Sequence, residues 1–445
     1  PATKPGDGYS GDLCLLNVQA SIHYSDGSNG KLETKKTEEN IYSFIVKLAN
    51  PDPIMAHIQT VLGINMREFK IYSDFIQKLN KFQEEKTDNE FPINIPEYIY
   101  GKCSGDEFVL VMQNMKVLDY VTNPKETRMN LCQTKKVLEQ LASLHAVSYA
   151  YEEMHNFLAN YPFLKADKFT DLLLVGMSTS LDLSVAYLES LSGKENLAKK
   201  IKVARSNVIK TCKESFKYDP TPQIMCLMHG DSWNNNILFS QKEDEHGTKS
   251  VKDSDDAILI DWQATHWNTP VADLHYFINS STSTELRKDH LDDVLKHYHT
   301  IFTEATIKLG TPVPAWTFEQ FKKEYDQMKV YGFLKGLLFA QMLSEFSATM
   351  RIGDVPTGPP NPVVKSIKKG IAKAMVPLVL RPSIMEAGIK KFTKPLKEEL
   401  LEGKTQLLCD AYLDLLLEAD ENGIFDIELP SSDEDDNGSR SLKCI

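Results

Sequence analysis

The chain has 445 residues, of which 42% are hydrophobic and 25% are charged, as in an ordinary folded globular protein. Its length is enough for two or three domain-sized units. The formal net charge of −12, from 62 acidic and 50 basic residues, argues against nucleic acid or an anionic membrane as the main partner. A nucleotide is not excluded, because a lysine, Mg²⁺ and backbone amides can hold phosphate locally.

Cysteine usage and hydropathy indicate where such a chain resides. The 7 cysteines are scattered and form no Cys-x-x-Cys pair, which predicts reduced thiols. No apolar run approaches the roughly 18 residues that span a bilayer, and no signal peptide opens the chain. The sequence therefore predicts a soluble, cytoplasmic protein, and it carries no signal for an oligomeric state.

The first motif in the chain is glycine-rich. Gly6, Gly8 and Gly11 have the spacing G-x-G-x-x-G, and the apolar residues 13–18 that follow predict a strand. In a kinase such a loop lets backbone amides approach the nucleotide phosphates. The pattern is weak by itself, because Gly-rich turns are common.

The composition predicts a polar turn at residues 25–30 and an exposed loop or strand edge over 31–40. The β-rich run that follows, over 41–46, predicts a second strand, which ends at Lys47. A lysine at the end of an apolar strand fits the role of pairing nucleotide phosphates. Taken alone, Lys47 is equally well read as a strand-end lysine on the surface.

Helical spacing follows over residues 64–81, with large apolar side chains near one face. Glu68 lies on this predicted helix, where a kinase offers a glutamate to the strand lysine. The alternative is a solvated glutamate on a surface helix. Residues 108–112 predict a buried strand, and Gln113 begins its exit, where a hinge between two lobes would lie. A small N-terminal lobe over residues 1–115 is therefore expected.

Beyond residue 116 the chain is mostly helical. A strong helix is predicted over residues 137–148, and its His145 is expected to be a structural histidine. A polar, charged stretch over 241–256 predicts a solvated loop between paired strands. Further helical patterns cover residues 167–215, 286–302, 318–346 and 363–418, with a helix-breaking loop at 358–362. We expect a large lobe over 116–426 and a disordered acidic tail over 427–445.

The strongest chemical signal is the stretch 228–239. Its His-Gly-Asp ends at Asp231 and is followed five residues later by Asn236, and a second apolar run, 257–260, leads into Asp261. This is the order of a phosphotransferase catalytic loop and its metal-binding partner. Asp231 is predicted to take the proton of an acceptor hydroxyl, while Asn236 and Asp261 bind Mg²⁺ against the phosphates of ATP.

The prediction depends on the joint order of these motifs. Singly, Asp231 can be a turn-capping aspartate, but the loop, the later aspartate, the lysine and the glutamate all occur in the order of a kinase. A hydrolase or a metal centre at His229 is disfavoured, because neither G-x-S-x-G nor H-E-x-x-H is present. A protein kinase is disfavoured by the lack of D-F-G and A-P-E.

These residues resemble the ecdysteroid kinase-like family of arthropods, also described as choline-kinase-like and related to aminoglycoside and choline phosphotransferases. The resemblance spans about residues 6–350. Its matching pieces are Ile45-Val46-Lys47, Glu68-x-x-Ile71-Tyr72, Val109 to Met115, Leu141 to Ser148, His229 to Asn236, Ile260 to Gln263, and Pro270 to Phe277 with the Ser/Thr run to Arg287.

The resemblance implies an α+β, bilobal protein-kinase-like fold with a small β-rich lobe and a larger helical lobe, together with ATP and Mg²⁺. It assigns Lys47 to the phosphates, Glu68 to pairing with Lys47, and Asp273 to bracing the catalytic loop. Asp231 would be the base, with Asn236 and Asp261 as metal ligands. Two departures stand out: the hinge approach reads Met112-Gln113-Asn114, which is expected to alter the adenine contacts of Gln113, and the segment from Lys47 to Pro51 is longer than usual.

The function expected from the resemblance is ATP-dependent phosphorylation of a small-molecule alcohol, with an ecdysteroid or related steroid as the best match. Choline, ethanolamine or a xenobiotic alcohol is the alternative acceptor, and a ligand-binding pseudokinase is the alternative of another class. Four aromatic residues near the motifs either line an apolar acceptor pocket or belong to the core: Trp233, Trp262, Trp267 and Tyr276.

Overall fold

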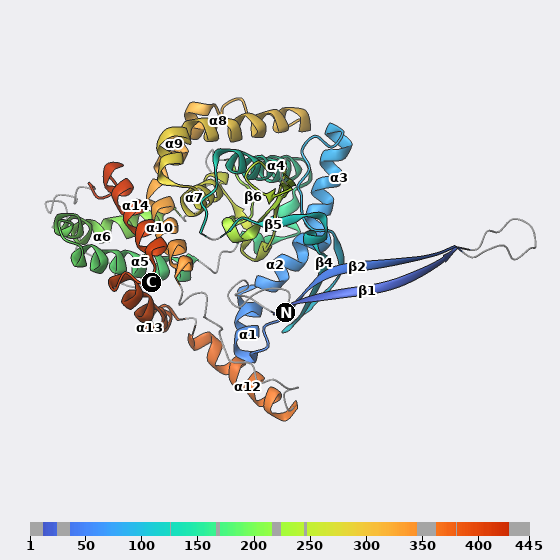
Figure 1. Cartoon of the computed structure of the whole chain (residues 1–445), viewed down its shortest axis with the longest axis horizontal. Coiled ribbons are helices and arrows are strands. Elements are labelled where there is room, and N and C mark those ends of the chain that lie inside the picture. Colours follow the sequence, from blue (N-terminus) through green and yellow to red (C-terminus); the bar gives the residue numbers. More distant parts are fainter. Residues whose placement is uncertain are drawn as a thin grey trace, which may run out of the picture.

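The computed structural model describes residues 12–24, 36–124, 126–165, 170–215, 224–243, 247–344, 362–379 and 381–426. Four sequence predictions lie outside these residues: the glycine motif of Gly6, Gly8 and Gly11, the turn at 25–30, the loop at 358–361 and the acidic tail. Within them, an N-terminal antiparallel sheet with its helices adjoins a larger, mostly helical part (Figure 1). The predicted bilobal protein-kinase-like fold is confirmed.

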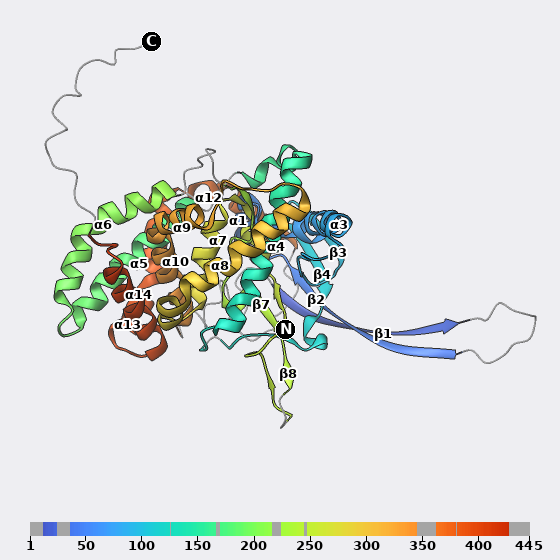
Figure 2. The ribbon, with the colours of Figure 1, turned by 90° about the horizontal axis from the view of Figure 1, so that it is seen from above.

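The small lobe is built on a four-stranded antiparallel sheet in the order β1-β2-β4-β3. Its strands are β1 (Asp12–Tyr24), β2 (Lys36–Leu48), β3 (Tyr98–Ser104) and β4 (Glu107–Gln113). The strands predicted at 13–18, 41–46 and 108–112 are confirmed, although β1 and β2 are longer than expected. These two pair along their whole length, from Asp12 opposite Leu48 to Tyr24 opposite Lys36, and project from the body (Figures 1 and 2).

Three helices lie between β2 and β3 in the chain, and the second of them contacts β3. They are α1 (Pro53–Leu62), α2 (Ile64–Lys70) and α3 (Ile76–Thr87), and a π-helical turn over Ile71–Phe75 joins the last two. The predicted helix at 64–81 is thus confirmed as α2, the π turn and the start of α3. Its apolar face is buried at Tyr72, Phe75 and Leu79, which holds the helix against the core and fixes the direction of Glu68.

The large lobe is organised around one long helix, α4 (Leu131–His155), in which His145 is buried as expected. Short antiparallel strands lie beside it: β5 (Tyr120–Thr122), β7 (Ile237–Ser240) and β10 (Ala257–Leu259) in one sheet, β6 (Cys226–Met228) and β11 (His266–Asn268) in another. Between β7 and β10 the chain forms a further small pair, β8 (Lys242–Glu243) and β9 (Lys249–Ser250).

Nine further α-helices are described in the rest of the chain. They are α5 (Thr170–Ser190), α6 (Glu195–Ser215), α7 (Pro270–Ser281), α8 (Thr284–Leu309), α9 (Phe318–Gln327), α10 (Lys329–Ala340), α12 (Pro362–Val379), α13 (Pro382–Leu401) and α14 (Gln406–Glu421). The prediction of one helix over 318–346 is wrong, because the chain leaves helical geometry at Met328 (φ −96°, ψ 10°) and α10 starts in a new direction.

The C-terminal helices do not all stay with the large lobe. Helix α12 packs against α1 of the small lobe, with Ala372 and Val376 buried and Lys369 Nζ 3.9 Å from Asp106 Oδ2 (Figure 1). The proposed lobe boundaries at residues 115 and 426 stay a prediction, with α12 crossing between the two parts. Within the described residues, no helix has both the length and the apolar composition needed to cross a bilayer.

Candidate active site

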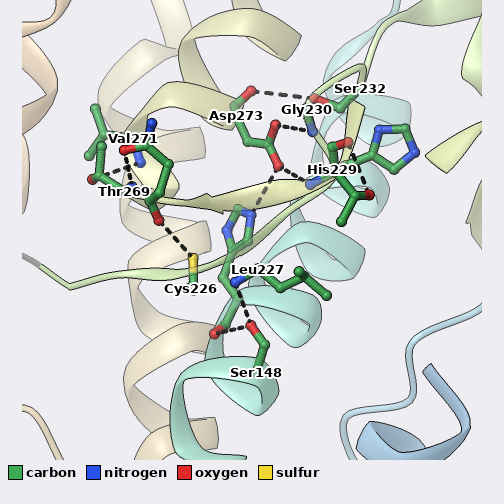
Figure 3. Close-up of polar contacts among 12 residues, drawn as sticks. Ser148, Cys226, Leu227, His229, Gly230, Ser232, Thr269, Val271 and Asp273 are labelled. Atoms are coloured by element: carbon green, nitrogen blue, oxygen red, sulfur yellow. Dashed lines mark hydrogen bonds and ion pairs between the residues drawn. The ribbon is translucent and has the colours of Figure 1, made fainter. Parts of the chain in front are cut away.

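One buried carboxylate holds the loop between β6 and β7 in place. Asp273, in the first turn of α7, accepts hydrogen bonds from the backbone amides of His229 (2.6 Å) and Gly230 (2.8 Å; Figure 3). It also accepts a hydrogen bond from Nε2 of His145 (3.2 Å). Burial alone would raise the pKa of Asp273, but the hydrogen bond from His145 and the other donors lower it below its ordinary value. Asp273 therefore stays ionised and fixes the loop that leads to Asp231.

The neighbouring elements hold Asp273 in turn. Helix α7 starts with Thr269 as N-cap, whose hydroxyl accepts from the amide of Val271 (3.4 Å), and with a proline at its first position (Figure 3). Strand β6 is tied to α4 because the Ser148 hydroxyl accepts from the Leu227 amide (3.0 Å). The expectation that His145 is a structural histidine is confirmed, since its Nδ1 also contacts the hydroxyl of Tyr298 (2.8 Å).

The catalytic-loop motif and the metal motif lie against each other. His229 Nε2 donates to the carbonyl of Ile260 (3.0 Å). Gly230 has φ +80°, and a Cβ built there would lie 2.3 Å from the carbonyl oxygen of Ala264. Only glycine allows both this backbone conformation and this close approach. The loop therefore passes directly over the segment that begins at Asp261.

The two oxygens of the Asp231 carboxylate have different partners. Oδ1 accepts from the hydroxyl of Tyr276 (2.5 Å) on α7, and Oδ2 accepts from the amide nitrogen of Asn236 (2.7 Å). Burial raises the pKa of Asp231 to about 7, and the negative charge of Asp261 adds to the effect. A carboxylate with this pKa is a competent general base near neutral pH.

A second group of charges joins the two lobes. Lys47, at the end of β2, places its Nζ 2.9 Å from Glu68 Oε1 on α2 and 3.2 Å from Asp261 Oδ1. Burial would lower the pKa of Lys47, but the carboxylates of Asp261 and Glu68 raise it above its ordinary value, so the ammonium group stays charged. Gln263 Nε2 donates to the other oxygen of Glu68 (3.2 Å), which links this group to the segment that follows Asp261.

The predicted metal ligands fit Mg²⁺ by their donor atoms. The amide nitrogen of Asn236 donates to the carbonyl and the carboxylate of Asp231 (2.9 and 2.7 Å), so its amide oxygen points away from Asp231. Asp261 adopts φ +65°, a strained backbone conformation for a residue other than glycine, and directs Oδ1 to Lys47. One amide oxygen and one carboxylate, completed by phosphate and water oxygens, are a sufficient set for Mg²⁺.

The remaining predicted nucleotide contacts are less well defined. Gln113 ends β4, beside the strand that carries Lys47, and its backbone N–H donates to the carbonyl of Glu97 (2.9 Å). A contact between Gln113 and a nucleotide base would therefore use other atoms of this residue. Gly6, Gly8 and Gly11 lie outside the described residues. The roles of all these residues in nucleotide binding stay predictions.

A cavity of about 210 Å³ opens next to the Asp231 carboxylate. It is lined mainly by apolar and aromatic side chains with a few polar groups, as ligand sites usually are. The lining residues are Ile64, Leu173, Ser215, Gly230, Asp231, Gln263, Ala264, His266, Asn268, Ala272, Met328, Tyr331, Lys335 and Phe339. The Asp231 carboxylate is thus part of the wall of a cavity whose surface is otherwise largely apolar.

Sequence reasoning missed some residues of the site. For Tyr276 the sequence left open whether it lines a pocket or belongs to the core. It follows Asp273 by three residues, which puts both side chains on one face of α7. That spacing could have indicated that Tyr276 lies at the site. Lys335 on α10 carried no motif. The tryptophans Trp233, Trp262 and Trp267 are buried in the core, and none is among the described lining residues of the cavity.

Fold and site together define a protein of the protein-kinase-like class, with a lysine–glutamate pair in the small lobe and an Asp–Asn loop and a second aspartate in the large lobe. Residues 5–311 match the profile of the ecdysteroid kinase-like family. The chain belongs to this family, as the motifs predicted. No curated protein sequence matches the chain.

Solved structures similar to the chain are, by their titles, aminoglycoside and spectinomycin phosphotransferases. Aminoglycoside-3′-phosphotransferase of type VIII is 15% identical, covering 72% of this chain and 93% of its own, with a TM-score of 0.29. A variant of aminoglycoside 2′-phosphotransferase IIIa with GDP is 13% identical (73% and 89% covered, TM-score 0.34). Spectinomycin phosphotransferase with ADP and spectinomycin is 10% identical (83% and 93% covered, TM-score 0.32).

Proposed function

We propose that the protein is an ATP-dependent small-molecule kinase that transfers the γ-phosphoryl group to a hydroxyl of a small molecule, with an ecdysteroid or related steroid alcohol as acceptor. One observation carries the proposal. The carboxylate of Asp231 lines a mostly apolar cavity, contacts Asn236, and lies close enough to Asp261 for their charges to interact. A base is thus available where an alcohol can bind, beside the residues suited to hold phosphate.

In the proposed reaction the acceptor hydroxyl binds in the cavity beside the Asp231 carboxylate and gives its proton to Asp231, as the hydroxyl oxygen attacks the γ-phosphoryl group and ADP leaves. The hydrogen bonds from Tyr276 and Asn236 hold the carboxylate in one orientation, which favours in-line attack on the phosphoryl group. Lys47, kept charged and positioned by Glu68, supplies positive charge to the phosphates. Mg²⁺, held by Asn236 and Asp261 when bound, would neutralise the charge that develops on the transferring group.

The rate is expected to depend on pH through Asp231. Because its pKa is raised to about 7, the carboxyl is protonated and inactive as a base below that pH. The value of kcat/KM should therefore increase about tenfold per pH unit up to about pH 7 and then level off. Steady-state rates between pH 5 and 9 at saturating nucleotide measure this. A profile that is flat from pH 5 to 8 would show that the base has an ordinary carboxyl pKa.

A phosphorylation screen tests the proposed function directly. The full-length chain is incubated with labelled ATP and Mg²⁺ and with ecdysteroids, other sterols, choline, ethanolamine and plant phenolic alcohols, and labelled products are separated. We expect transfer to an ecdysteroid or a related steroid alcohol. Transfer to choline or ethanolamine alone would favour the other acceptor class, and transfer to xenobiotic alcohols alone would favour a detoxifying kinase.

A ligand-binding pseudokinase is the proposal's rival from another class. Nucleotide with Mg²⁺ should stabilise a competent enzyme by about 2.7 kcal/mol at a concentration a hundred times its Kd. Little or no stabilisation by ATP and Mg²⁺, together with no transfer in the screen, would favour the pseudokinase. A cytoplasmic location and the lack of nucleic-acid or membrane partners also belong to the proposal, since they rest on charge and cysteine usage.

A further inference from the structure

A lysine forms part of the wall of the cavity beside Asp231. Lys335, on α10, has only 3% of its surface exposed. A buried ammonium group needs compensation for its lost hydration. Two aromatic rings contribute to it, because Nζ lies 4.2 Å from the ring centroid of Tyr276 and 5.0 Å from that of Phe339. The negative charge of Asp231 contributes as well. The cavity wall thus carries a positive charge of its own.

This lysine occupies the aromatic faces that a cationic alcohol would use. Sites for choline-type cations bind the ammonium group over several aromatic rings. Here Phe339 lines the cavity and packs against Tyr276, with 4.5 Å between ring centroids, and Lys335 lies over both rings. Tyr331 is the other aromatic residue of the described lining. A cationic acceptor would therefore meet a like charge where it needs an open aromatic surface.

The acidic group of the described lining is already engaged, because the charge of Lys335 interacts favourably with the Asp231 carboxylate. Among the described lining residues the only carboxylate is that of Asp231. Its two oxygens already accept from Tyr276 and Asn236, and the proposed mechanism uses it for the acceptor's hydroxyl. An uncharged alcohol has no such conflict, and its oxygen atoms can accept hydrogen bonds from an ammonium group.

We propose that Lys335 is a specificity-determining residue that makes the cavity accept uncharged alcohols and reject cationic ones. The inference rests on the proposed function in one respect, because it takes the cavity as the acceptor site. It excludes choline and ethanolamine as acceptors and leaves uncharged steroid-type and xenobiotic alcohols.

The test compares two probes of the same shape and different charge. Choline and 3,3-dimethylbutan-1-ol differ by one atom, since a quaternary nitrogen in the first is a quaternary carbon in the second. Binding of each to the full-length protein is titrated by ligand-observed NMR in the presence of Mg²⁺ and a non-hydrolysable ATP analogue. For the unaltered protein we expect the uncharged probe to bind at least tenfold more tightly.

Three variants assign the effect to the charge at this position. Lys335→Met should remove most of the difference between the probes, and Lys335→Arg, which keeps the charge, should retain it. Lys323→Met makes the same change at an exposed lysine of α9 and should retain it as well. Equal or tighter binding of choline to the unaltered protein, or no binding of the uncharged probe at all, overturns the inference. So does an unchanged ratio in Lys335→Met.

This outcome is separable from that of the proposed function. The titration involves no phosphoryl transfer, so a protein that prefers the uncharged probe but phosphorylates no alcohol refutes the kinase proposal alone. Conversely, an enzyme that phosphorylates choline as well as uncharged alcohols retains its kinase function and refutes the role of Lys335.

Discussion

Replacing Asp231 by asparagine is expected to reduce phosphoryl transfer by about a hundredfold to ten-thousandfold, the usual contribution of a general base. The amide cannot take the proton of the acceptor hydroxyl, although it can still contact Tyr276 and Asn236. Nucleotide binding should change little, because Lys47 and Glu68 are untouched. Single-turnover rates with labelled ATP measure the loss, and Asp255→Asn, at an exposed side chain, is the matched control. Near-full activity of Asp231→Asn would show that another group is the base.

The same substitution should not weaken the fold, and the sign of its effect on stability follows from the raised pKa. Because the folded state holds the Asp231 proton up to about pH 7, whereas an unfolded carboxyl releases it near pH 4, ionisation between these values costs stability. Asparagine avoids this cost, on the order of 2–4 kcal/mol. The stability of Asp231→Asn relative to the unaltered protein should therefore rise from pH 5 to pH 8, as denaturant unfolding can show. A variant that is less stable at pH 8 than at pH 5, relative to the unaltered protein, contradicts this assignment.

Asp273→Ala, unlike Asp231→Asn, is expected to lower the free energy of unfolding. Activity should be lost as a consequence. The change leaves two backbone amides and His145 without their buried acceptor, at a cost of about 3–5 kcal/mol. Because the pKa of Asp273 is lowered in the folded state, its stabilising effect is present above the ordinary pKa near 4 and is lost as the pH falls through the lower folded value.

Denaturant unfolding at pH 7 and at pH 3.5 checks this expectation. The difference from the unaltered protein should be largest at pH 7 and should shrink at the acidic pH. Asp292→Ala removes a carboxylate that is 77% exposed on α8 and should change the free energy of unfolding by less than about 1 kcal/mol. If Asp273→Ala proved as stable as this control, the carboxylate would not be holding the loop.

The sequence predicted the parts of the molecule whose signals are local. Strand periodicity located β2 and β4, and the order of Lys47, Glu68, Asp231, Asn236 and Asp261 indicated a shared site. The structure joins Lys47 to Glu68 and Asp261, and Asn236 to Asp231. The two groups lie close enough for the charges of Asp231 and Asp261 to interact. Their roles stay predictions, since contact alone does not establish catalysis.

The parts that were not predicted depend on tertiary packing. Lys335 reaches the cavity because α10 packs against α7, and nothing beside it in the sequence indicates that contact. The break at Met328 was missed because neither glycine nor proline marks it, and apolar residues continue on both sides. The position of α12 against α1 was not predictable either, since amphipathic spacing identifies a buried face without identifying its partner.

The return of α12 to α1 has a consequence for biosynthesis. The chain emerges from the ribosome N-terminus first, so α1 is made long before Ala372 and Val376, the α12 residues that are buried in the folded protein. Until then the corresponding side of α1 faces solvent or a chaperone. A nascent chain stalled before residue 362 should therefore show faster amide exchange over residues 53–62 than the released protein.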